Sequence, residues 1–404
     1  MSKQALEGLK VADFCWVLAG PIVGLYLAHH GATVIRIESM RRPDTLRLSV
    51  PFKDNIPGVN RAGIWNSINS SKFGMSLNLN HPKGIEVAKR LVAWSDVAGE
   101  SFAPGIMERF GLGYNELKKV KPDIIMYSSS NLGQTGPEAT QPGFGAMLVS
   151  YAGFTHLSGW PDRMPAQPYH AYTDFPAPRF LVAAVLAVVD YHRRTGKGQY
   201  LDLSQTEVGT QFIAPVILDY TVNNRIETRD GNRCPYAAPH GAYPCRGDDR
   251  WCAIGVFTDE EWNALCRVMG NPEWTKKAKF ATLLGRKENE EELNERLGEW
   301  TINFTAEEVM EKLQAAGVPA GVVKNAADIQ DDPQLAHRHY FWQLENPEMG
   351  MHYCEAAGSI MSKTPTEIRR PAPLLGQHTE YVCREMLGMS DEEFVDLFNQ
   401  GVFE

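Results

Sequence analysis

The sequence predicts an α/β protein that begins with a parallel, doubly wound sheet and continues into a smaller α+β domain. Residues 9–17 are mostly apolar and β-prone, Gly20 and Pro21 mark a turn into a helix, and residues 32–38 form a second strand. A strand–helix–strand opening is typical of a parallel sheet with helices on both faces. The composition changes after about residue 220, which indicates a second domain.

Further elements of the large domain follow in chain order. Residues 81–97 form a helix with a proline near its start, and residues 122–130 form another buried strand. After Asp174, the helix expected at residues 180–194 is apolar on every side, so we expect it to be buried all round. Together these elements predict a Rossmann-like large domain.

The second domain has a different pattern of elements. Two short strands are expected at residues 240–246 and 250–257, and a charged, amphipathic surface helix at residues 286–300. The helices that follow the strands begin at capping-box pairs, in which a threonine precedes a glutamate by three residues. These pairs are Thr258 with Glu261 and Thr305 with Glu308.

We therefore expect three parts in the chain. Residues 1–220 form the large α/β domain, residues 225–330 form the small α+β domain, and residues 331–404 return to the large domain. The last part ends in a helix capped by Ser390.

Composition excludes several classes of protein. A net charge of −9 argues against a nucleic-acid partner, whose binding relies on a strong basic field. The longest apolar run, Leu181–Val189, is shorter than the roughly 20 residues of a membrane span, and no secretory signal is visible. The seven cysteines are scattered without a C-x-x-C pair, which predicts free thiols rather than a metal site. We expect a cytoplasmic location, no membrane partner and no metal.

The opening turn only partly fits a dinucleotide-binding motif. That motif needs three glycines spaced G-x-G-x-x-G, whereas this turn has Gly20 and Gly24 with Pro21 between them. A nicotinamide or flavin enzyme is therefore disfavoured. Backbone N–H groups at the start of the helix can still approach a phosphate-bearing ligand.

Motifs along nearly the whole chain carry a family resemblance. In order they are LEGLKVADF, LAGPIVGLYLAHHGATVIRIE, NSSKFGMSLNLNHPKG, ESFAPGIMERFGLGYNELKKVKPDIIMYSSSNLGQTGP, TDFPAPRF, RRTGKGQYLDLS, AGVPAGVV and APLLGQHT. Their order and spacing resemble the class III CoA-transferase family, of CaiB/BaiF type. The resemblance implies a CoA-transferase with coenzyme A as substrate and product. It also implies two chains interlocked as rings, the partner being an identical chain or a paralogous subunit.

The resemblance places the family's nucleophile at Asp174, ahead of the RTGKGQ turn. A carboxylate can attack an acyl-CoA thioester, giving an aspartyl anhydride and then an aspartyl-CoA thioester. The alternative from the residues alone is that Asp174 caps the following helix, because aspartate is a good N-cap.

The resemblance also implies CoA contacts. Ser101 stands where the family usually has asparagine, and Ser39 stands where some members have a phosphate-binding arginine, so Arg41, Arg42 or Arg47 is expected to substitute. The expected CoA-binding residues are Val17, Leu18, Ala19, Leu77, Asn80, Ser101, Phe102, Ala103 and the phosphate-binding Arg109.

One segment separates related activities. Acyl-CoA racemases of this family carry a histidine and an acid where this chain has Phe144 and Gly145. Racemisation takes two acid–base groups, so a transferase is favoured over the alternative of a racemase or isomerase. A non-catalytic subunit of a heteromeric transferase is a third reading. The aromatic residues nearby suggest transfer from a donor such as succinyl-CoA to an aryl-substituted acid such as benzylsuccinate, and so possible membership of the benzylsuccinate branch.

Overall fold

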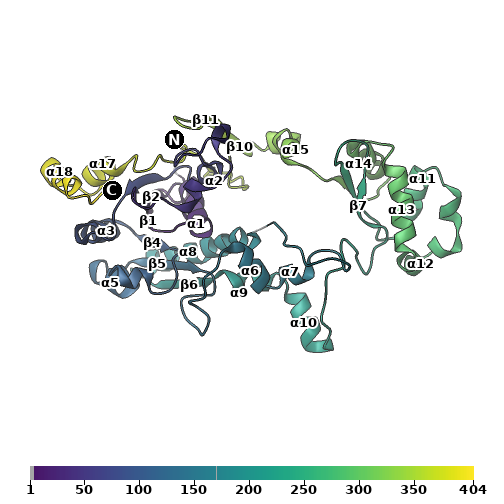
Figure 1. Cartoon of the computed structure of the whole chain (residues 1–404), viewed down its shortest axis with the longest axis horizontal. Coiled ribbons are helices and arrows are strands. Elements are labelled where there is room, and N and C mark those ends of the chain that lie inside the picture. Colours follow the sequence, from purple (N-terminus) through teal and green to yellow (C-terminus); the bar gives the residue numbers. More distant parts are fainter. Residues whose placement is uncertain (1–3, 170) are drawn as a thin grey trace. The chain divides into compact units, whose positions relative to one another are not determined.

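The computed structural model describes residues 4–169 and 171–404, and Figure 1 shows its elements. The chain divides into two compact units. The larger consists of the chain up to His156 together with Ala166–Glu227 and Gln334–Glu404, and the smaller of Leu157–Pro165 with Thr228–Pro333. The larger unit therefore combines three segments that are distant in sequence.

A six-stranded parallel sheet forms the centre of the larger unit. Its strand order is β3-β2-β1-β4-β5-β6, so the chain moves outward from β1 in one direction and then crosses back to β4 on the other side. The predicted α/β class with a parallel sheet is confirmed. The strands are β1 (Lys10–Asp13), β2 (Thr33–Glu38), β3 (Phe73–Ser76), β4 (Val97–Glu100), β5 (Ile125–Ser130) and β6 (Tyr200–Ser204).

Helices cover both faces of this sheet. Alternate strand residues point to opposite faces. Ile125 and Tyr127 pack with α1 (Ala19–His29) and α8 (Pro176–Thr195). Met126 packs instead in the second core, whose helices are α3 (Pro82–Trp94), α5 (Tyr114–Val120) and α18 (Asp391–Asn399).

The expectation that the helix after Asp174 is buried all round is wrong. One side of α8 packs on the sheet through residues such as Leu181 and Val185, whereas Phe180 and Leu186 are exposed. By length and composition alone, the helical segment Tyr172–Thr195 could cross a membrane. Half of its most apolar 18-residue stretch is, however, buried within the structure. Core helices of soluble proteins pass the same test.

The larger unit contains further helices and two strands that do not belong to the six-stranded sheet. They are α2 (Gly63–Ile68), α4 (Ile106–Arg109), α6 (Gly145–Tyr151), α7 (Phe154–Leu157, ending at the unit boundary), α9 (Gln205–Gln211), α10 (Ala214–Asn223), α16 (Pro333–His337, beginning at the unit boundary), β10 (Phe341–Asn346), β11 (Gly350–Glu355) and α17 (Thr379–Tyr381). Two of these helices, α6 and α9, contribute residues to the site described below.

The smaller unit has its own sheet and core. Its antiparallel sheet has the order β7-β8-β9, and helices pack on it around a buried cluster that includes Trp262 and Leu265. The expected strands and both capping boxes are confirmed, since Thr258 and Thr305 each accept the predicted backbone hydrogen bond. The elements are β7 (His240–Pro244), β8 (Trp251–Gly255), α11 (Asp259–Val268), α12 (Leu283–Glu288), α13 (Glu290–Thr301), α14 (Ala306–Ala315), β9 (Ala320–Val322) and α15 (Ala326–Gln330).

Candidate active site

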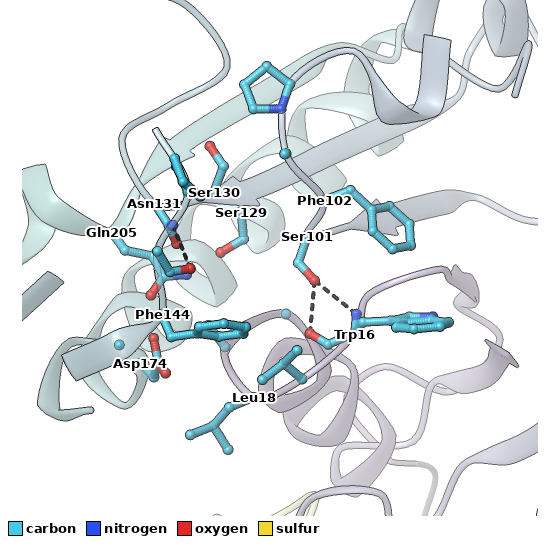
Figure 2. A pocket seen from close by; sticks show the side chains of 18 of the residues that line it. Trp16, Leu18, Ser101, Phe102, Ser129, Ser130, Asn131, Phe144, Asp174 and Gln205 are labelled. Atoms are coloured by element: carbon cyan, nitrogen blue, oxygen red, sulfur yellow. Dashed lines mark hydrogen bonds between the residues drawn. The ribbon is translucent and has the colours of Figure 1, made fainter. Parts of the chain in front are cut away.

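A cavity of about 300 Å³ lies at the carboxyl ends of β1, β4, β5 and β6. The loops after these strands line it, together with residues 141–145, Asp174 and Gln205, as Figure 2 shows. In open parallel sheets, ligands bind beyond the carboxyl ends of the strands, where the strand order reverses. The reversal between β1 and β4 therefore places this cavity where a ligand site is expected.

The structure brings most of the predicted site residues together. Two predicted triplets, residues 17–19 and residues 101–103, line the same cavity as Asp174. The other three lie elsewhere in the larger unit. Leu77 is buried in the core against α3, Asn80 is exposed beside Asn78, and Arg109 is exposed at the end of α4.

Ser101 ties the two CoA-binding loops to each other. Its hydroxyl accepts a hydrogen bond from the Trp16 backbone N–H at 2.9 Å and donates one to the Trp16 carbonyl oxygen at 3.0 Å. Figure 2 shows both contacts. The Ser101 side chain thus holds the loop after β1 against the loop after β4. This serine stands at the position where the family usually has asparagine.

Val17 adopts a strained backbone conformation that a buried ion pair holds in place. Its φ is 65°, which is unusual for a β-branched residue and costs of order 1–3 kcal/mol. The Asp44 carboxylate accepts a hydrogen bond from the Val17 N–H at 3.0 Å and pairs with Arg36, and both charged side chains are fully buried. The buried ion pair of Asp44 with Arg36 therefore supports the loop that forms this part of the cavity wall.

Asp174 closes a short 3-10 turn, Tyr172–Asp174, directly before α8. The helix N-cap is Phe175, and no side chain caps it, so the alternative that Asp174 is a helix cap is wrong. Its side chain is 8% exposed. Burial raises the pKa of the Asp174 carboxyl to about 7, because an ionised carboxylate loses hydration in this cavity.

Gly145 packs directly against Asp174. A Cβ atom placed on Gly145 would lie 2.5 Å from Asp174 Oδ2 and 2.5 Å from the Ala171 Cβ. The position where related racemases carry an acid therefore has no room for a side chain while Asp174 occupies its present place. Phe144, at the histidine position, is exposed and lines the cavity.

The three arginines proposed to replace an arginine at Ser39 have different surroundings. Arg47 is fully buried in an ion pair with Glu38 and cannot reach a ligand. Arg41 is exposed and pairs with the side-chain carboxylate of the last residue. Arg42 lies over the ring of Trp16, 5.7 Å from its centroid, and Trp16 lines the cavity.

Several polar residues that line the cavity were not among the site residues predicted from the sequence. Ser129 and Ser130 end β5, Asn131 follows them, and Gln205 begins α9 directly after β6. Strand 122–130 was expected, and the carboxyl ends of parallel strands meet at one edge of a sheet. That rule could have identified the two serines, whereas Gln205 follows a strand that was not predicted.

Comparison with known proteins gives the class of this enzyme. The model of a family described as CoA-transferase family III matches residues 6–379. The chain therefore belongs to CoA-transferase family III and is a CoA-transferase, as the resemblance implied.

Relatives and solved structures agree with this assignment. The chain is 31% identical to succinyl-CoA–D-citramalate CoA-transferase of Chloroflexus aurantiacus, over 98% of this chain and 97% of the relative. It is also 31% identical to the succinyl-CoA–L-malate CoA-transferase beta subunit of the same organism, over 98% of each chain. A CaiB/BaiF family protein from Brucella suis has the same fold, with a TM-score of 0.88 and 29% identity over 95% of this chain and all of that one.

Replacing Gly145 with alanine tests the packing around the carboxyl group. The added methyl group would displace Asp174, and for the nucleophilic role that the resemblance implies, a misplacement of about 1 Å costs roughly 100-fold in rate. We expect Gly145→Ala to lower kcat for CoA transfer by at least about 10-fold. Gly321→Ala is the matched control, because a Cβ there meets open space. An unchanged kcat in Gly145→Ala would show that the close contact has no role.

Proposed function

We propose that this CoA-transferase moves CoA from an acyl-CoA donor such as succinyl-CoA to a carboxylic acid, with Asp174 as the covalent nucleophile. The observation that carries the proposal is the buried Asp174 carboxyl, which lies in the same cavity as both predicted CoA-binding triplets. The two relatives described above are named for succinyl-CoA, which supports this donor. Their names do not favour an aryl-substituted acceptor such as benzylsuccinate, which stays a prediction.

The reaction proceeds by transfers at one carboxyl group. The Asp174 carboxylate attacks the thioester carbonyl, the C–S bond breaks, and the products are an acyl-aspartyl anhydride and the CoA thiolate. The thiolate attacks the aspartyl carbonyl, releasing the donor acid and forming an aspartyl-CoA thioester. The acceptor carboxylate then attacks this thioester, which breaks its C–S bond, releases the CoA thiolate and forms a second anhydride. The thiolate attacks the acyl carbonyl of this anhydride to give the new acyl-CoA and free Asp174.

The raised pKa of Asp174 suits this role. Only the ionised carboxyl attacks, and a carboxylate with a pKa of about 7 is more basic than an ordinary one. Near neutral pH about half of the free enzyme carries the reactive form, which balances reactivity against ionisation. We therefore expect kcat/KM to rise with pH through about 7 and to level off above it.

Removing the carboxylate tests the mechanism. We expect Asp174→Asn, purified as this chain alone, to lose CoA transfer by at least about 10³-fold, because no other carboxylate is among the described residues that line the cavity. Hydroxylamine added during turnover of the wild type should convert Asp174 to a hydroxamate detectable by mass spectrometry. Asp190→Asn, an exposed carboxylate on the following helix, is the control. Full activity of Asp174→Asn would contradict the mechanism, and an inactive wild type would favour the non-catalytic subunit.

Arg42 is proposed to bind the phosphate of the CoA adenosine end. Among the three candidate arginines, Arg42 is the one with a described contact to a cavity-lining residue, Trp16. We expect Arg42→Ala to raise KM for the acyl-CoA by about 10-fold, since hydrogen bonds to charged groups contribute about 1.5–3 kcal/mol. Arg41→Ala should leave KM within about 2-fold. The effect should disappear with a 3′-dephospho-CoA thioester, and an equal effect on both thioesters would refute this assignment.

A second copy of the chain is proposed to cover α10. This helix is largely apolar, yet none of its residues is buried, and Leu218 and Val222 are 62% and 71% exposed. Folded monomers rarely leave such patches uncovered. The interlocked-ring arrangement and the cytoplasmic location stay predictions.

Placing a charge on α10 tests this assembly. We expect the wild type to sediment as a dimer and Leu218→Asp to sediment as a monomer, because a carboxylate buried in an apolar interface is costly. Val120→Asp, at an exposed position on α5, should leave the dimer intact. A monomeric wild type in sedimentation velocity would refute the proposal.

A further inference from the structure

We propose that the acceptor acid carries a hydroxyl group, which Ser129 and Gln205 bind beside Asp174. This substrate class rests on the proposed function, because it assigns the acyl end of the same cavity. The inference starts from polar atoms in that cavity that have no partner within the protein.

Three buried polar groups of the described cavity residues lack hydrogen-bond partners, and one of them, the Ser130 hydroxyl, lies on the opposite face of β5 from Ser129. The hydroxyl of Ser129 and the Oε1 atom of Gln205 are both unpaired, and these residues are 1% and 6% exposed. Buried polar side-chain atoms in folded proteins nearly always have a partner, from the protein or from a bound molecule. Because both residues line the cavity that holds Asp174, the proposal assigns the missing partner to a ligand bound there, in place of ordered water.

The strand pattern places Ser129 on the Asp174 side of the sheet. Along β5, Tyr127 packs with α1 and α8, so Ser129, two residues on, faces the same way. Asp174 directly precedes α8. Ser128 and Ser130 face the opposite side, where the Ser128 hydroxyl accepts a hydrogen bond from Tyr200 at 2.8 Å. In Figure 2 the Ser129 side chain points toward the part of the cavity where Asp174 and Gln205 lie.

Gln205 approaches the same place from a different element. It begins α9 directly after β6, and α9 packs on the turn that contains Asp174: a Cβ on Gly209 would lie 2.9 Å from the Thr173 side chain. The two unpaired groups and the nucleophile therefore come from three separate segments that meet in one cavity.

The chemistry of the unpaired atoms selects the ligand group. The Oε1 atom of Gln205 accepts hydrogen bonds and needs a donor, whereas a serine hydroxyl can donate as well as accept. A carboxylate on the ligand only accepts, so it would leave Oε1 unpaired. A hydroxyl group satisfies both, because it donates to Gln205 and accepts from Ser129. A methyl group in its place would leave both protein groups buried and unpaired.

Pairs of acceptors that differ only by hydroxyl and methyl test the proposal. With succinyl-CoA as donor, we would compare 3-hydroxybutyrate with 3-methylbutyrate, and malate with methylsuccinate, using both enantiomers of each chiral acid. We expect kcat/KM to favour the hydroxylated member of at least one pair by about 50-fold or more, since sites built to bind a hydroxyl strongly reject analogues that lack it. Equal values within every pair would overturn the proposal.

Single substitutions then assign the preference to residues. Ser129→Ala and Gln205→Met should each reduce the hydroxyl preference by at least about 10-fold and leave kcat/KM for the methyl analogue within about 3-fold. Ser359→Ala is the control, since it removes the same hydroxyl from an exposed serine that is not among the cavity-lining residues, and it should keep the preference. If Ser129→Ala lowers both members of a pair equally, the serine acts on the reacting carboxyl group and the proposal is wrong.

Binding to an inactive variant separates this proposal from the proposed function. Isothermal titration of Asp174→Asn with 3-hydroxybutyryl-CoA and 3-methylbutyryl-CoA, or with malyl-CoA and methylsuccinyl-CoA where that pair showed the preference, should show tighter binding of the hydroxylated thioester. Selective binding without any transfer by the wild type would uphold the hydroxyl site and refute the proposed function. Transfer by the wild type without selectivity in either assay would refute the hydroxyl site alone.

Discussion

The desolvation of one carboxyl group is the constraint on which the site depends. Asp174 is nearly buried, and burial alone accounts for the rise of its pKa to about 7. A carboxyl group in that state can ionise near neutral pH and is not held in an ion pair, which suits the nucleophilic role proposed for Asp174. An ion pair would have the opposite effect, because a neighbouring cation lowers the pKa and makes the carboxylate less reactive. The neighbours of Asp174 follow from this requirement: Gly145 leaves it space and α8 begins after it without using it as a cap.

A fully buried ion pair supports one of the loops that line the cavity. Asp44 and Arg36 form a fully buried pair, and Asp44 uses its remaining capacity to hold the strained Val17 amide. Breaking such a pair leaves an uncompensated buried charge, so the pair also fixes the loop conformation. Ser101 joins this loop to the one after β4. The wall that faces the ligand is therefore preorganised before any ligand binds, which limits the ordering cost of binding.

The sequence predicted the parts of the fold that have strong local patterns. Strands β1, β2 and β5 are apolar runs and lay where expected, but β3, β4 and β6 were missed because they are short and contain glycine, serine or charged residues. Their strand conformation depends on pairing with neighbours, which local sequence does not record. The same limit applies to the site. The loop triplets and Asp174 could be located by resemblance, whereas the contact between Gly145 and Asp174 depends on tertiary packing.

Two kinds of group in the cavity divide the work of the reaction. In the proposed mechanism Asp174 attacks the carbonyl carbon, and this step does not distinguish between acids because every acyl-CoA has the same thioester group. Discrimination must come from groups that do not react, and Ser129 and Gln205 are buried, uncharged and unpaired in the same cavity. Hydrogen bonds made there to a remote part of the acid can offset the cost of desolvating the nucleophile and its substrate. In the proposed reaction, these two side chains select the acceptor through its hydroxyl group, and Asp174 carries out the covalent step.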